Sequence, residues 1–149
     1  MSAFVTAGGG FLLAVLWFDL MFDVQVLGHR GRELPEAALS SIAAYYRRVT
    51  TAARPMNRLI AAAMLATIAA LVVEIAQADV PGAVAWPSLA LAAAPIALAG
   101  TRTVPAAVRL GARGDTPARQ SALARTICRE HLLCLASIAA LLALQLSCA

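Results

Sequence analysis

Two aspartates one helical turn apart, Asp19 and Asp23, lie inside an apolar stretch that covers residues 4–27. A helix turns by about 100° per residue, so side chains four positions apart share one face. A charged carboxylate that faced lipid would cost roughly 3 kcal/mol on insertion scales. We therefore expect both carboxylates to face protein, water or a cation, and acids at such a depth indicate a functional site.

Three further apolar stretches, residues 56–75, 82–100 and 127–146, approach the length of about 20 residues that a helix needs to cross a bilayer. The chain of 149 residues is 61% hydrophobic and 13% charged, whereas soluble domains are about 25% charged. The sequence therefore predicts one all-α integral membrane domain over residues 1–149. We expect a polytopic four-helix bundle that crosses the cell membrane several times and is surrounded by membrane lipids.

The 12 basic side chains are all arginines, and their positions predict the orientation of the chain. Half of them follow the first stretch or open the second, and the other half follow the third or open the fourth. By the positive-inside rule, both arginine-bearing connections are cytoplasmic and both termini lie outside, an N-out/C-out topology. The positions of the arginines follow from this topology, so the net charge of +4 does not indicate a surface for nucleic acid. We therefore predict no nucleic-acid partner.

Prolines and apolar spacing predict the remaining helix boundaries. Pro35 suits the first turn of an amphipathic cytoplasmic helix between the first two spans. Apolar side chains recur there at helical spacing, at Leu39, Ile42, Tyr46 and Val49. Pro95 predicts a kink in the third span, whose helix is expected to continue towards Leu110. Pro117 predicts the start of one long helix that ends near residue 146.

The predicted topology brings polar side chains of all four spans to the cytoplasmic end, and any cavity is expected to open there. The candidate catalytic residues are Asp19, Asp23 and His131, and the candidate binding residues are Asn57, Arg58, Arg102 and Arg129. Glu74 is expected near the outer end, within reach of water. Two plainer interpretations stay open. Arginines at helix ends also serve as lipid anchors, and an aspartate also pairs with an arginine as a structural staple.

The sequence predicts no cofactor, with a metal or haem as the alternative. Cys128-x-x-His131-x-x-Cys134 places neighbouring members one turn apart, but the two cysteines lie about 120° apart around the helix. All three therefore cannot reach one ion without distortion. If a transition metal binds, the expected ligands are the carboxylates of Asp19 and Asp23 and the imidazole of His131.

Two segments resemble the small four-helix membrane family that includes the anthrone oxygenases. They are Thr101-Arg102-Thr103-Val104-Pro105, with Val-Pro near the end of the third span, and residues 125–131, which end with His131 in the fourth helix. The resemblance implies an oxidoreductase that oxygenates a hydrophobic polycyclic phenol without a cofactor and receives it from the lipid. His131 or Asp19 would then act as the base, and Arg58 or Arg102 would hold the resulting anion.

A non-enzymatic function is the alternative. A bundle with an acidic pair also suits the binding of a lipid, a quinone or a metal, a proton or ion pathway, or assembly with a larger membrane complex, and a homo-oligomer stays open. A transporter would usually need more helices or an internal repeat. A hydrophobic small-molecule partner is common to the enzymatic and the binding interpretations.

The predicted topology can be tested directly. Cysteine labelling or reporter fusions at Asp79, in the connection that carries no arginine, and at the C-terminus should both report the extracytoplasmic side. A C-terminus in the cytoplasm would contradict the prediction. The topology would then no longer place Asp19 and His131 at the same depth in the membrane.

Overall fold

The computed structural model describes residues 2–147, apart from the side chain of Arg54, and these residues form helices joined by short turns, with no strand among them. The predicted all-α class is therefore confirmed. In chain order the elements are α1 (Ser2–Asp23), the 3₁₀ helix η1 (Val24–Gly28), α2 (Glu36–Tyr46), the π-helix η2 (Arg47–Ala52), α3 (Arg54–Gln77), α4 (Gly82–Leu98), the π-helix η3 (Ala99–Thr103), α5 (Val104–Ala112) and α6 (Pro117–Leu146).

Four helical stretches are long and apolar enough to cross a membrane, as predicted. They cover Ser2–Gly28, Pro55–Gln77, Gly82–Ala112 and Pro117–Leu146. The third continues past Pro87 and Pro95 through η3 into α5. Pro105 falls in the first turn of α5, where a missing N–H costs little. The fourth begins where the Thr116 hydroxyl accepts a hydrogen bond from the Arg119 backbone N–H and caps the helix.

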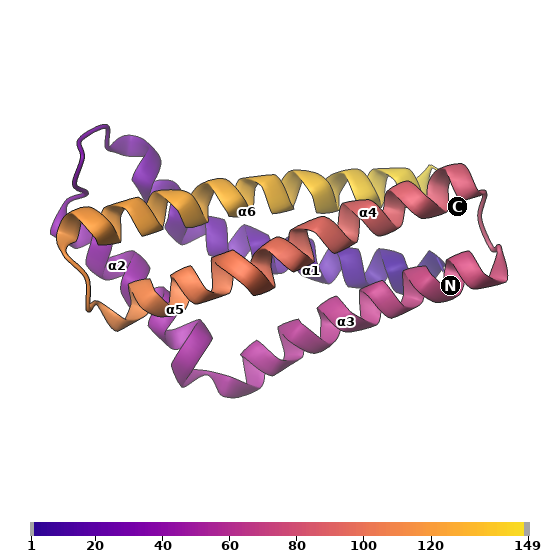
Figure 1. The fold of residues 1–149 in the computed structure, drawn as a ribbon, viewed down its shortest axis with the longest axis horizontal. Helices are drawn as coiled ribbons and strands as arrows, with labels where there is room; N and C mark the ends of the chain where they lie inside the picture. Colours follow the sequence, from indigo (N-terminus) through magenta and orange to yellow (C-terminus); the bar gives the residue numbers. More distant parts are fainter. Residues whose placement is uncertain (1, 148–149) are drawn as a thin grey trace.

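The four long stretches lie side by side along the longest axis of the molecule (Figure 1). Helix α6 packs against α1 and α4, and α3 packs against the same two helices. The two arginine-bearing connections, residues 29–35 and 113–116, lie at one end together with α2 (Figure 1). Both termini and the turn between α3 and α4 lie at the other end (Figure 1), which we call the terminal end.

Apolar side chains fill the space between the helices in two clusters. One lies among the long helices and includes Val5, Leu12, Leu71, Ile138 and Leu141. The other joins α2 to α5 and α6 and includes Leu39, Ile42, Tyr46, Leu110 and Ile127. Other large apolar side chains are exposed on the long helices, among them Phe4, Trp17, Leu65, Trp86 and Leu133. A surface of this kind suits contact with lipid tails and would be unfavourable in water.

The amphipathic helix expected after Pro35 is α2, and its apolar side packs against α5 and α6. The contact is close at Gly111 of α5. A Cβ atom at this position would lie 2.8 Å from the backbone nitrogen of Arg47 and 3.0 Å from its Cα. Only a glycine therefore lets α5 approach the chain where α2 passes into η2.

The expectation for Glu74 was wrong. Its side chain is fully buried at the terminal end of α3, where it was expected to meet water. The Gln145 amide of α6 donates a hydrogen bond to Glu74 Oε2 at 3.0 Å and another to Ser88 Oγ of α4 at 3.1 Å. Proximity to the end of a span did not expose the acid, because the last turns of α3 face α4 and α6.

The contact at Gly111 leads to a matched pair of variants. Gly111→Ala should lower the free energy of unfolding by about 1–3 kcal/mol, because the added methyl group meets backbone that cannot rotate away. Gly10→Ala adds the same methyl group to α1 in open space and should be neutral or stabilise the helix by up to about 1 kcal/mol. Thermal unfolding in detergent micelles, followed by far-UV circular dichroism, measures both. Equal midpoints for the two variants would contradict the close contact.

Candidate functional site

The carboxylate of Asp23 is the most enclosed charged group of the site. Its side chain is fully buried on α1, and its two oxygens each have a partner from another helix. The Tyr46 hydroxyl donates to Oδ1 at 2.7 Å, and His131 Nδ1 lies 2.6 Å from Oδ2. A carboxylate only accepts hydrogen bonds, so Nδ1 carries the proton of this contact. The other imidazole nitrogen, Nε2, is then left as an acceptor when the ring is neutral.

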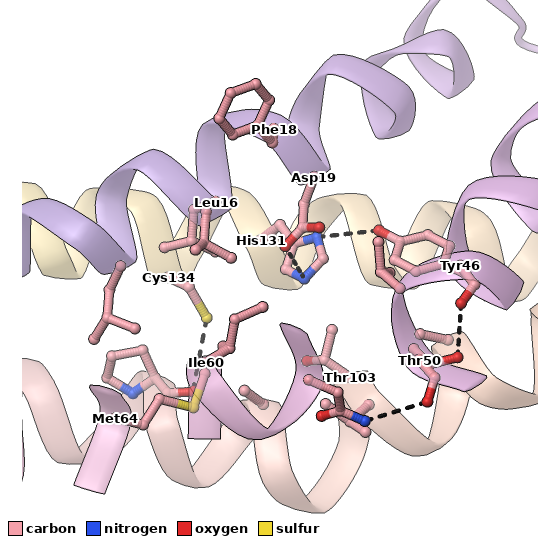
Figure 2. A pocket seen from close by; sticks show the side chains of 18 of the residues that line it. Leu16, Phe18, Asp19, Tyr46, Thr50, Ile60, Met64, Thr103, His131 and Cys134 are labelled. Carbon is pink, nitrogen blue, oxygen red and sulfur yellow. Dashed lines mark hydrogen bonds and ion pairs between the residues drawn. The ribbon is translucent and has the colours of Figure 1, made fainter. Parts of the chain in front are cut away.

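Asp19 approaches the same imidazole from the other side. The Tyr45 hydroxyl donates to Asp19 Oδ1 at 2.7 Å, and Asp19 Oδ2 lies 3.8 Å from His131 Nε2. This distance is too long for a direct hydrogen bond but suits an ion pair when the imidazole is protonated. Asp19 and His131 point towards one another in Figure 2. Two hydrogen-bond acceptors, Asp19 Oδ2 and His131 Nε2, therefore lie side by side.

The two tyrosines that hold the acids were missed by the sequence analysis, which treated Tyr46 only as part of the apolar face of α2. Burial raises the pKa of both phenols, and the neighbouring aspartates raise it further. Both hydroxyls therefore stay protonated, and act as donors, at neutral pH. A tyrosine on the buried face of a helix usually needs a partner for its hydroxyl, and this was the available signal. Stacking of the Tyr45 ring on Phe22 of α1, with centroids 4.1 Å apart, also fixes α2 against α1.

A cavity of about 360 Å³ begins at this pair of acceptors and extends between the helices. Its polar lining includes Asp19, Tyr45, Tyr46, Thr50, Asn57, Thr103 and His131. The rest is almost entirely apolar, with side chains such as Leu12, Leu16, Phe18, Met56, Ile60, Met64 and Ile138. Asp23 is not part of the lining and lies behind the imidazole (Figure 2 shows the lining). Pockets of this size and character hold small hydrophobic molecules in other proteins.

The predicted cations do not meet the acids. Arg102 lies 3.3 Å from Glu130 Oε1, and the Thr103 hydroxyl donates to Glu130 Oε2 at 2.7 Å. Arg58 and Arg129 are exposed, and within the described part of the chain neither forms an ion pair with Asp19 or Asp23. We expected at least one of the two acids to pair with an arginine or with His131 from another span, and the partner is His131, 2.6 Å from Asp23. Arg102 pairs instead with Glu130, which directly precedes His131.

Asn57 does reach the cavity, although it is exposed at the start of α3. Its amide donates to the Thr50 backbone carbonyl at 3.2 Å and so joins α3 to η2. Arg125 at the same end of the molecule has a structural role, since its guanidinium donates to the carbonyls of His29, Gly31 and Arg32 and holds the connection between α1 and α2.

The cysteines of the Cys-His-Cys pattern lie apart. Cys128 belongs to the apolar cluster around α2, whereas Cys134 lines the cavity with its thiol 3.8 Å from the Pro95 carbonyl. Among the described residues, no three side chains of His, Cys, Asp or Glu are arranged to hold a metal ion. In the alternative ligand set, His131 Nδ1 is already engaged with Asp23. Cys148 lies outside the described residues.

No protein-family model, curated protein or solved structure matches this chain. The resemblance to the anthrone oxygenase family therefore depends on the two sequence segments alone. The structure brings these segments together, because Thr103 of the first donates to Glu130 of the second. Any functional interpretation consequently depends on the geometry of the cavity.

The environment of the two tyrosines predicts unequal effects of removing their hydroxyls. Tyr46→Phe leaves an oxygen of the fully buried Asp23 without its donor and should cost about 1–3 kcal/mol of stability. Tyr45→Phe, its matched control, removes the same hydroxyl from the partly exposed Asp19, where water can replace it, and should cost less. Unfolding midpoints in detergent compare the two. A larger loss in Tyr45→Phe would contradict the assignment of Asp23 as the buried partner.

Proposed function

We propose that this protein is a multi-pass enzyme of the cell membrane that removes a proton from a hydrophobic aromatic substrate with His131 as the base. The observation that carries the proposal is the apolar cavity that ends at His131, with Asp23 bound behind the ring. In this arrangement Asp23 keeps the proton on Nδ1 and stabilises the imidazolium that forms when Nε2 takes a second proton. Asp19, 3.8 Å from Nε2, adds to this stabilisation.

The surroundings of the cavity support a substrate that partitions into lipid. Phe18 and Met56 line the cavity and are also exposed on the outer surface of α1 and α3. A flat apolar molecule would therefore pass from the bilayer between these two helices. The arginine-bearing connections lie at the same end of the molecule as the site, so we place this end at the cytoplasmic leaflet, with the four long helices forming a bundle in an N-out/C-out orientation.

The resemblance to the anthrone oxygenases suggests that oxygenation comes after proton removal. A CH₂ group between two aromatic rings is a carbon acid, and its carbanion is electron-rich enough to react with O₂. The balanced change converts CH₂ and O₂ into C=O and H₂O, so carbon loses four electrons and O₂ gains them. No further oxidant is required. The side chains of this chain would bind the rings, accept the first proton at His131 Nε2 and return it to the departing oxygen as water forms.

Binding without turnover is the second candidate function, and the charge of the cavity favours it. Apart from His131, no basic side chain lines the cavity within the described part of the chain. The Asp19 carboxylate lines its polar end, and the Asp23 carboxylate lies behind His131. Such an end receives a neutral hydrogen-bond donor, such as the hydroxyl of a quinol or a lipid, more readily than an anion. The two candidates differ in whether a bound molecule is consumed.

Anthrone, a three-ring carbon acid, separates the candidates in one experiment. Purified protein in detergent should consume O₂ and form anthraquinone at neutral pH above the background without enzyme, with one O₂ used per quinone formed. His131→Gln should lower the rate by about 100-fold or more, because removal of a general base typically has this effect. An oxygen electrode and quinone absorbance measure the two quantities.

The exposed Glu33→Gln variant, which changes an acid of the connection after α1, serves as the control and should keep the wild-type rate. Native mass spectrometry of gently extracted protein provides the second measurement. A retained hydrophobic molecule without O₂ consumption would support the binding function, and a folded His131→Gln protein with the wild-type oxygenation rate would exclude His131 as the base.

A further inference from the structure

A second group of buried polar side chains lies at the terminal end, on the other side of the apolar cluster from the cavity. Glu74 of α3 and Ser88 of α4 are fully buried, and Gln145 of α6 is 1% exposed. Gln145 lies 14 residues after His131 on one helix, which corresponds to about 21 Å at 1.5 Å per residue. Apolar side chains such as Leu71 and Leu141 lie among the helices in this region. This polar group is therefore separate from the candidate active site.

The Glu74 carboxylate is incompletely satisfied. Oε2 accepts a hydrogen bond from the Gln145 amide at 3.0 Å, whereas Oε1 is buried and has no hydrogen-bond partner. Within the described part of the chain, Glu74 forms no ion pair with an arginine or histidine. A buried charged group without a counter-charge is strongly unfavourable, and an unpartnered oxygen adds to the cost. A cation bound at this oxygen would supply both the missing partner and the missing positive charge.

We infer that Glu74, Ser88 and Gln145 form a binding site for a monovalent cation of the sodium class. The available ligands are hard oxygens from three helices: the Glu74 carboxylate, the Ser88 hydroxyl and the Gln145 side-chain carbonyl. Gln145 Oε1 accepts from the Ser2 hydroxyl at 3.4 Å. A half-turn of the amide would direct Oε1 towards Glu74, and the ion would then replace the hydrogen bonds that the Gln145 nitrogen donates to Glu74 and Ser88. Hard oxygen ligands suit alkali and alkaline-earth ions rather than transition metals.

Charge selects among the hard cations. The site contains one carboxylate, and its other ligands are neutral, so a monovalent ion gives a neutral complex. A divalent ion would leave a net positive charge in an apolar environment, which is costly. The bound ion would join α3, α4 and α6 at the terminal end, where Figure 1 places both termini and the turn between α3 and α4. Its predicted consequence is stabilisation of the folded protein by the ion.

Thermal unfolding of the full-length protein in detergent tests the site. NaCl, LiCl, KCl and choline chloride are compared at constant ionic strength. At least one alkali cation should raise the unfolding midpoint of the wild type in a saturable manner relative to choline, because a ligand that binds only the folded state stabilises it. Glu74→Gln keeps the shape of the side chain but removes its charge, and should abolish the increase. Glu33→Gln, which removes an exposed acid, should retain it.

Equal midpoints of the wild type in all four salts would overturn the proposal, and so would an alkali-dependent increase that persists in Glu74→Gln. A midpoint that responds to pH but to no alkali cation would assign a proton to Glu74 in place of the ion. If Glu74→Gln does not fold, equilibrium dialysis of the wild type with ²²Na⁺ gives the answer. About one saturably bound ion per chain is expected, with about tenfold weaker binding in Ser88→Ala, and no saturable binding in the wild type would exclude the site.

Discussion

The buried carboxylate of Asp23 imposes the constraint on which the rest of the site depends. In an apolar environment a carboxylate requires donors for both oxygens, and here these donors come from Tyr46 of α2 and His131 of α6. Between helices in lipid, apolar contacts give little preference for one arrangement over another, because lipid tails are as apolar as leucine. Hydrogen bonds of this kind therefore fix how α1, α2 and α6 are rotated relative to one another. The same contact fixes the tautomer of His131 and leaves Nε2 facing the cavity.

The fold was largely predictable from the sequence because length, hydropathy and proline positions act locally. A long apolar stretch of this kind crosses a bilayer as a helix. A proline that follows a polar turn, such as Pro117, favours the first turn of a helix. The shared end of Asp19, Asp23 and His131 followed from counting along two helices from the arginine-bearing connections. None of these inferences required knowledge of how a helix is rotated about its own axis, that is, of which neighbour each of its faces meets.

Rotation is what the sequence did not reveal, and each wrong or missing assignment has this cause. Glu74 was placed by its depth in α3 alone, but its side of the helix faces Gln145 and Ser88. Arg102 was at the expected depth, yet it pairs with Glu130, the residue before His131. The roles of Tyr45 and Tyr46 depend on how α2, which lies outside the four spans, packs back onto them.

The cavity itself arises from two places where the helical hydrogen-bond pattern is altered. Both π-helical segments contribute to its lining, η2 through Thr50 and η3 through Thr103. A π-helix has one extra residue per turn, which bends and widens the helix locally and is often found at functional sites. After η2 the chain leaves helical geometry at Ala53 before α3 begins, and α3 and α1 diverge towards this end (Figure 1). The divergence leaves space between α1 and α3 that the mostly apolar side chains lining it do not fill. The two altered segments thus lie on the same cavity as His131, which leaves room beside the imidazole for a second molecule.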